Sequence, residues 1–144
     1  MNPNKRMNDM TESEINIDEL AAKRDVAGLM AALNSKDNTT RYSAASAISK
    51  LGPDAAQAIP ALIELLKHWD AMTRVAAAGA IGNIGIACRE IARPAVPALQ
   101  EALKDKEPMV RRVAGTALED IDTELWVGWD EDDDSDSEIF NDVL

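Results

Sequence analysis

Three arginines in this chain each follow an acidic residue by four positions, and no other pattern offers as much binding chemistry. The pairs are Asp37 with Arg41, Asp70 with Arg74, and Glu107 with Arg111. Guanidinium groups at three equivalent positions would suit an acidic ligand. The same spacing also serves structure, because an acid that begins a helix caps its N-terminus and the arginine bonds to it or to a neighbouring turn. Since the pair recurs, we interpret all six residues as structural braces.

The other reactive side chains stand alone. His68 is the only histidine and Cys88 the only cysteine. A metal site needs three or four ligands, and no His, Cys and Asp set has the spacing of a catalytic site. We therefore expect no enzyme activity, no metal and no cofactor. Trp69, which follows His68, is expected to pack as a cap over a turn between two helices.

The arginines also mark a repeat. They lie 33 and then 37 residues apart, and each is followed by small or aliphatic residues at offsets +3, +6, +7 and +10. These residues are Ala44, Ala47, Ile48 and Leu51, then Ala77, Ala80, Ile81 and Ile84, then Ala114, Ala117, Leu118 and Ile121. Such spacing is typical of one face of a helix. A period of this length indicates stacked helical repeats.

Each repeat is predicted to hold two helices. The first helices are expected over 26–34, 60–68 and 98–104, and the second helices over 39–51, 72–85 and 108–121. Asp25 has the character of an N-cap, and Gly52 followed by Pro53 that of a helix end. A short helix over 19–24, capped by Asp18, is expected before them.

Between the second and third repeats, residues 86–96 are expected to form a surface connector. In the helix before it, Gly82 is expected to allow close packing between units and Gly85 to end the helix. The role of Gly79 is open, since a glycine inside a helix costs on the order of 1 kcal/mol relative to alanine.

The frame Leu-x-x-Leu-Lys, followed by Asp-x-x-x-Arg-x-x-Ala-x-x-Ala-Leu/Ile-x-x-Ile/Leu, resembles the HEAT repeat. In particular it resembles the short, alanine-rich form found in phycobilisome-lyase-like proteins. The clearest copies are 62–85 and 99–122, and the first copy is 29–52. The resemblance implies an all-α fold, an α-solenoid of three HEAT-like helical hairpins. The composition of the two ends adds a disordered N-terminus and an acidic C-terminal tail. For function it implies a scaffold, an adaptor or an occasional enzyme subunit.

The corresponding domain division has three parts. Residues 1–17 form a disordered N-terminal segment, 18–122 the repeat domain, and 123–144 the acidic-aromatic tail. The repeats run over about 25–52, 58–85 and 95–122.

Composition narrows the class of protein. Of 144 residues, 46% are apolar but only 3% are aromatic, which suits closely packed helices better than a deep pocket. One cysteine cannot form an internal disulfide, no stretch resembles a signal peptide, and no run approaches the roughly 20 apolar residues of a membrane span. These features indicate a cytoplasmic protein without membrane insertion.

The net charge of −11 is concentrated in one segment. Residues 123–144 contain nine acidic residues and no basic ones, and the rest of the chain has a net charge of only −2. Nucleic-acid binding needs a clustered basic surface. We therefore expect no direct nucleic-acid binding.

The second helices offer a candidate contact surface, because in HEAT-like arrays they line the concave side. Offsets +2, +5 and +9 from each arginine are predicted to be exposed there, and small residues would let a partner helix or strand approach closely. The predicted concave-face residues are Ser43, Ser46, Lys50, Ala76, Gly79, Asn83, Val113, Thr116 and Asp120.

The tail offers a second candidate surface. Its aromatic residues would anchor a partner, and its acidic run would steer it towards a basic one. The predicted tail contacts are Trp126, Trp129, Asp130, Glu131, Asp132, Asp133, Asp134, Ile139 and Phe140. Two structural roles compete with this one, since Trp126 would also cover the open end of the last repeat and the acidic run would also keep the stack soluble.

Together these observations predict a protein–protein interaction module, a scaffold or adaptor that binds another protein, one with a basic surface, through the concave face, the tail or both. The alternative, drawn from the resemblance alone, is a bilin lyase-like or chaperone subunit for a chromophore-bearing protein. A third possibility is that the tail occupies the chain's own concave groove until it is displaced.

Overall fold

The computed structural model describes residues 15–121, and within this range every regular element is a helix. The order is α1 (Ile17–Ala22), α2 (Val26–Ala32), α3 (Asn38–Ser49), η3 (Gly52–Ala58), α4 (Ile59–Leu65), α5 (Ala71–Ala87), α6 (Arg89–Ala92), η4 (Arg93–Ala95), α7 (Val96–Ala102) and α8 (Pro108–Ile121). The predicted all-α fold is confirmed. Predictions for residues 1–14 and 122–144 lie outside the described residues.

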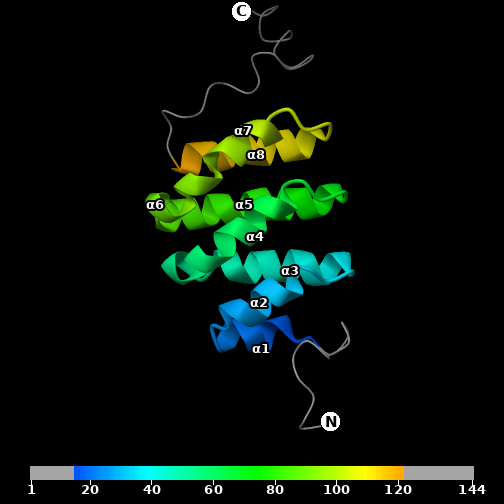
Figure 1. Cartoon of the computed structure of the whole chain (residues 1–144), viewed down its shortest axis with the longest axis vertical. Coiled ribbons are helices and arrows are strands. Elements are labelled where there is room, and N and C mark those ends of the chain that lie inside the picture. The colour runs from blue at the N-terminus through cyan, green and yellow to red at the C-terminus, as the bar shows by residue number, and fades with distance from the viewer. Residues whose placement is uncertain (1–14, 122–144) are drawn as a thin grey trace, which may run out of the picture.

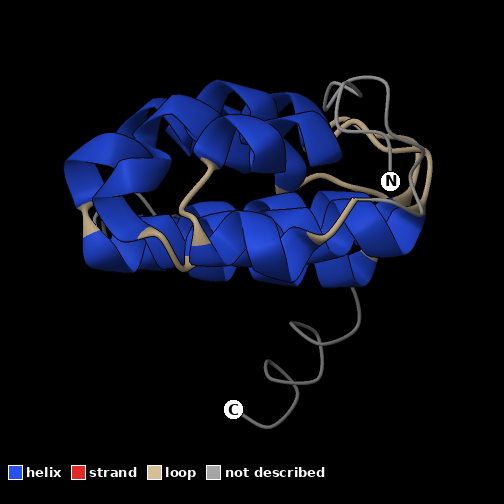
Figure 2. Cartoon of the chain, turned by 90° about the horizontal axis from the view of Figure 1, so that it is seen from below, coloured by secondary structure: helices blue, strands red, loops and turns tan. Residues whose placement is uncertain are grey.

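The helices form two layers. The longer second helices α3, α5 and α8 lie side by side in one layer, and the shorter first helices α2, α4 and α7 lie in the other (Figures 1 and 2). In the longer layer α5 packs between α3 and α8. Each hairpin therefore contacts its neighbours along the stack, as a solenoid requires.

Aspartates start the helices as their position in the sequence predicts. The carboxylates of Asp37 and Asp70 each accept a hydrogen bond from the backbone N–H three residues later, at 2.9 and 3.0 Å. Asp25 caps α2 in the same way at 2.9 Å. The prediction for α1 was wrong by two residues, because Asn16 and not Asp18 accepts from the third N–H.

The repeated aliphatic positions build a continuous core between the two layers. Ile48, Ile81 and Leu118 occupy equivalent places in α3, α5 and α8, and all three are completely buried. Leu29, Leu62 and Leu99 face them from the first helices and are equally buried. No single hairpin has enough surface to bury these side chains alone, so the stack is one cooperative unit.

The expected connector over 86–96 lies largely at the surface, but it is helical. α5 continues to Ala87, and the segment then forms α6 and η4. Ala92 and Ala95 are completely buried. Helical turns satisfy the backbone of this segment internally, so its alanines can pack against the stack instead of crossing the surface as a loop.

The glycines of α5 differ in what a side chain would meet. A Cβ on Gly82 would lie 3.1 Å from the backbone Cα of Ala117, so α5 and α8 approach closely there. A Cβ on Gly85 would lie 2.7 Å from Ile121 Cγ1. Gly85 therefore allows α5 to pack against α8, and the prediction that it ends the helix is wrong. A Cβ on Gly79 would meet only Val113 Cγ1, at an ordinary 3.8 Å.

This difference gives a matched pair of variants. Gly79→Ala should stabilise the fold by up to about 1 kcal/mol, because alanine favours the helix and meets no close neighbour. Gly82→Ala should destabilise it by about 1–3 kcal/mol, because the neighbouring backbone must move. Thermal unfolding of the two proteins checks this prediction, and a lower melting temperature for Gly79→Ala than for Gly82→Ala would contradict it.

Candidate functional site

The turn between the two helices of each hairpin has one bonding pattern that occurs three times. The arginine Nη1 donates to the carbonyl oxygen six residues earlier, from Arg41 to Ser35 and from Arg74 to His68 at 2.8 Å, and from Arg111 to Asp105 at 2.7 Å. The side chain of that earlier residue accepts the backbone N–H two positions after it, at 3.0, 3.0 and 2.9 Å. Ser35, His68 and Asp105 thus have the same role as hydrogen-bond acceptors in their turns. His68 accepts through Nδ1, so its proton lies on Nε2.

Two of the arginines also join one hairpin to the next. Arg41 Nε donates to Thr73 Oγ1 at 2.9 Å, and its Nη2 lies 3.5 Å from Asp70 Oδ2. Arg74 binds Asp105 with two hydrogen bonds, at 2.8 and 2.9 Å. Arg41 and Arg74 are 3% and 5% exposed, so neither is accessible to an acidic ligand. The acid that each one reaches belongs to the following hairpin and not to its own.

These contacts hold the carboxyl groups in the ionised form. The hydrogen bond from the Thr73 hydroxyl, assisted by the charge of Arg41, lowers the pKa of Asp70. For Asp105, burial by itself would raise the pKa, but the hydrogen bonds from Arg74 and from the Glu107 backbone outweigh it, and the pKa is lowered. Glu107 itself is exposed, and in this hairpin Asp105 receives the contacts.

Trp69 does not pack as a buried cap, contrary to expectation, because 77% of its surface is exposed. Its ring lies 5.2 Å from the His68 ring, and the guanidinium carbon of Arg41 is 6.0 Å from its centroid. A tight turn tip leaves no neighbouring surface large enough to cover an indole. In the other two hairpins the equivalent tip residues are Lys36 and Lys106.

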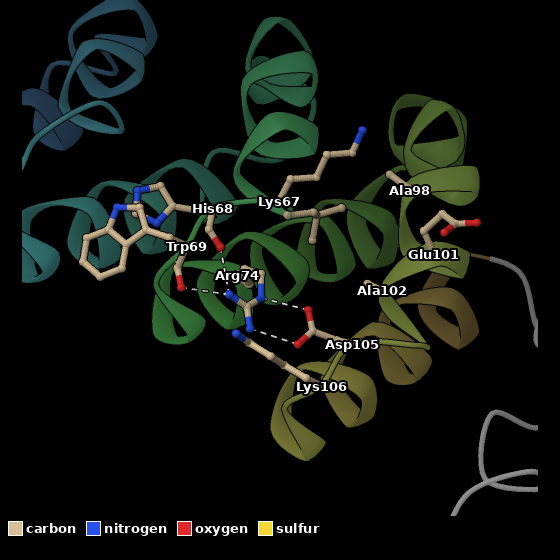
Figure 3. A pocket seen from close by; sticks show the side chains of 10 residues that line it. Lys67, His68, Trp69, Arg74, Ala98, Glu101, Ala102, Asp105 and Lys106 are labelled. Carbon is tan, nitrogen blue, oxygen red and sulfur yellow. Dashed lines mark hydrogen bonds and ion pairs between the residues drawn. The ribbon is translucent and has the colours of Figure 1, made fainter.

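Next to Trp69 the turns border a cavity of about 760 Å³, which we call the turn-edge pocket. Figure 3 shows Arg74 and Asp105 bonded to each other beside it, with Lys67 and Lys106 extending from the two turns. The pocket is lined by Leu66, Lys67, His68, Trp69, Arg74, Ala98, Glu101, Ala102, Asp105 and Lys106.

A second hollow lies on the face of the second helices that points away from the first helices. This second-helix groove has a volume of about 230 Å³ and no charged residue in its lining. It is lined by Tyr42, Ser46, Ser49, Val75, Ala76, Gly79, Ala80, Asn83 and Val113. Five of the predicted concave-face residues are therefore brought together here: Ser46, Ala76, Gly79, Asn83 and Val113.

The other four predicted concave-face residues lie elsewhere. Ser43 and Lys50 line an adjoining cleft of about 440 Å³ between α1 and α3. Thr116 is exposed on α8 and donates to the carbonyl of Arg112 at 3.2 Å. Asp120 lies over Gly82, and its burial there, with the nearby charge of Glu119, raises its pKa. The predicted tail residues from Trp126 to Phe140 lie outside the described residues.

Sequence reasoning missed the exposed apolar side chains of the second helices. Tyr42, Met72, Ile86 and Met109 are all between 50% and 67% exposed. Met72 precedes Ala76 by four residues, and Met109 precedes Val113 by four, so each shares a helix face with a groove residue. That spacing was visible in the sequence, but methionine in an alanine-rich helix is ordinarily a core residue.

The comparisons with known proteins agree with this geometry. A family model described as HEAT repeats matches residues 26–118 and, overlapping it, 59–136. The chain belongs to the HEAT-repeat family. HEAT repeats generally mediate protein–protein interaction and typically form scaffolds without enzyme activity. No curated protein matches the chain.

Among solved structures, this HEAT-repeat chain is similar to the crystal structure of an engineered protein, a target of the Northeast Structural Genomics Consortium. The two share 25% sequence identity with a TM-score of 0.59, over 78% of this chain and 51% of the other. The chain thus spans about half the length of that protein. Within residues 15–121, no three metal-ligating side chains come together and no helix is long and apolar enough to cross a membrane.

The Arg74 junction should be sensitive to a conservative change. Arg74→Lys keeps the charge but cannot form the planar, two-bonded contact with Asp105 or reach both turn carbonyls, so we expect a loss of about 3 kcal/mol in unfolding free energy. Lys23→Ala, which breaks the exposed pair between Lys23 and Glu19, should have little effect. Urea unfolding measures both, and equal losses would contradict the role assigned to Arg74.

His68 should make stability depend on pH near neutrality. Burial, together with the charge of Arg41, lowers its pKa from the ordinary 6.5. The unfolded chain therefore takes up the proton first, and stability falls as the pH drops below about 6.5. His68→Ser keeps the hydrogen bond that Ser35 makes in the first hairpin and should flatten the dependence between pH 7.5 and 5.5. Since the chain has one histidine, an unchanged slope would contradict this assignment.

Proposed function

We propose that this chain is a docking module whose second-helix groove binds an apolar helix or strand of a partner protein. The observation that carries the proposal is Gly79. A glycine inside α5 lowers helix stability by about 1 kcal/mol relative to alanine, and nothing packed around Gly79 requires the absence of a side chain. In the other two hairpins the equivalent residues are Ser46 and Thr116. A partner that approaches the α5 backbone accounts for the glycine.

The border of the groove has the chemistry of an adaptable contact surface. Met72 and Met109 are 51% and 56% exposed at the start of α5 and α8, and methionine adapts its shape to different apolar partners. Tyr42, 50% exposed, adds a rigid aromatic anchor with a hydroxyl group. Ser46 and Asn83 supply hydrogen-bonding groups within an uncharged lining. This combination fits the apolar face of an amphipathic segment.

The same proposal includes the location of the protein, the charge of its partner and a role for the tail. A cytoplasmic location, a basic region on the partner and additional contacts from the tail are consistent with the composition, in which nine acidic residues lie within 123–144. The bilin lyase-like alternative draws no support from the family match, which describes HEAT repeats alone, or from the engineered structural neighbour.

Filling the groove tests the proposal. Gly79→Leu places a side chain in the groove, and its Cβ meets only Val113 Cγ1, at an ordinary 3.8 Å. We expect recovery of proteins bound to the immobilised full chain, quantified from cell lysate, to fall at least tenfold for the specific partner.

The matched control is Gln100→Leu, which adds the same side chain to an exposed position of α7 in the other layer. It should leave recovery unchanged. If a correctly folded Gly79→Leu protein recovers the same partner as the unaltered chain, the groove is not the binding surface.

A further inference from the structure

The turn-edge pocket is a second surface, distinct from the second-helix groove, and it combines an exposed aromatic ring with uncompensated positive charge. Trp69 is the most exposed of the large apolar side chains in residues 15–121. The equivalent lysines in the other hairpins show that the turn does not need an aromatic residue for its own structure. The ring of Trp69 is therefore available for a ligand.

The charges that face the pocket come from two turns and from α7. Arg74 and Asp105 neutralise each other through two hydrogen bonds. Lys67 and Lys106 are exposed and form no ion pair with another described residue, while Glu101 is the one remaining acid in the lining. The rim thus keeps a net positive charge in a chain whose total is −11. The apolar part of the lining consists of Leu66, Ala98 and Ala102.

We propose that the turn-edge pocket binds residues 129–134 of the chain's own tail. In this segment Trp129 is followed at once by five consecutive acidic residues, Asp130 to Asp134. Trp129 packs at the edge of the pocket beside Trp69, and the acidic run pairs with Lys67 and Lys106. Neither the second-helix groove nor the cleft beside α1 offers this complement. The second-helix groove has no charged lining, and the cleft beside α1 is lined by Asp18 as well as Lys50 and Arg24, of which Arg24 binds Asp54.

The chain length allows the contact. The pocket lies at the turn just before α8, and the tail leaves from the other end of this helix, whose 14 residues span about 21 Å. Asp130 lies nine positions after Ile121, and an extended chain covers roughly 3.3 Å per position, or about 30 Å in all. The acidic run can therefore return along α8 to Lys106. Tethering gives it an effective concentration in the millimolar range, so a modest affinity keeps the pocket occupied.

The test uses the full chain and a fluorescein-labelled peptide of residues 125–140, with binding followed by fluorescence anisotropy. In one variant, the tail-neutral chain, Asp130→Asn, Glu131→Gln, Asp132→Asn, Asp133→Asn and Asp134→Asn remove the acidic run. We expect the tail-neutral chain to bind the peptide at least tenfold more tightly than the unaltered chain, whose own tail competes. Adding Lys67→Glu and Lys106→Glu to it should weaken binding at least tenfold, and adding Trp69→Ala at least threefold.

Two controls separate this proposal from the groove. Lys50→Glu and Gly79→Leu in the tail-neutral chain should leave peptide binding unchanged, and circular dichroism melts confirm that each variant folds. If the unaltered chain binds the peptide as tightly as the tail-neutral chain, the pocket is open to acidic segments of other molecules and the tail does not fill it. If the lysine reversals have no effect, the peptide binds elsewhere. Either result overturns the proposal, and neither bears on the groove.

Discussion

The structure depends on one interaction that occurs in every hairpin, the hydrogen bond from an arginine to the turn of its own hairpin. From the start of each second helix the arginine donates to a carbonyl six residues earlier, and in the first two hairpins it also reaches into the next turn. A buried guanidinium is tolerated because its donors are paired with carbonyl, hydroxyl and carboxylate oxygens. The same side chain thus closes a hairpin and fixes the distance to its neighbour, and the two-layer stack follows from repeating it.

The features that occur in all three repeats could be predicted from the sequence. The acid–arginine frame and the aliphatic offsets gave the all-α stack, the three hairpins and the structural use of Arg41 and Arg74, because each signal is local and occurs three times. The helical structure of the connector after α5 was missed, since a segment with Arg89, Arg93 and Pro94 has loop composition, and the burial of Ala92 and Ala95 depends on the neighbouring hairpins. The exposure of Trp69 also required the structure, because a sequence gives no account of whether a turn tip finds a surface to pack against.

At two positions where the copies differ, the stack gives no reason for the residue present. Trp69 stands where the other turns have lysine, and Gly79 stands where the other helices have serine or threonine. One marks the turn-edge pocket and the other the second-helix groove, on separate surfaces of a rigid scaffold. A repeat protein can change such positions without disturbing its core, so binding properties are added to the fold one residue at a time.

The central claim is that partners bind on the face formed by α3, α5 and α8. Methionine methyl NMR of the full chain tests it most directly, because Met72 and Met109 flank the groove while Met30 lies in α2 of the other layer. When the partner recovered through the groove is titrated into the labelled chain, the methyl signals of Met72 and Met109 should shift or broaden and that of Met30 should stay in place. A shift at Met30 with Met72 and Met109 unchanged would contradict the account.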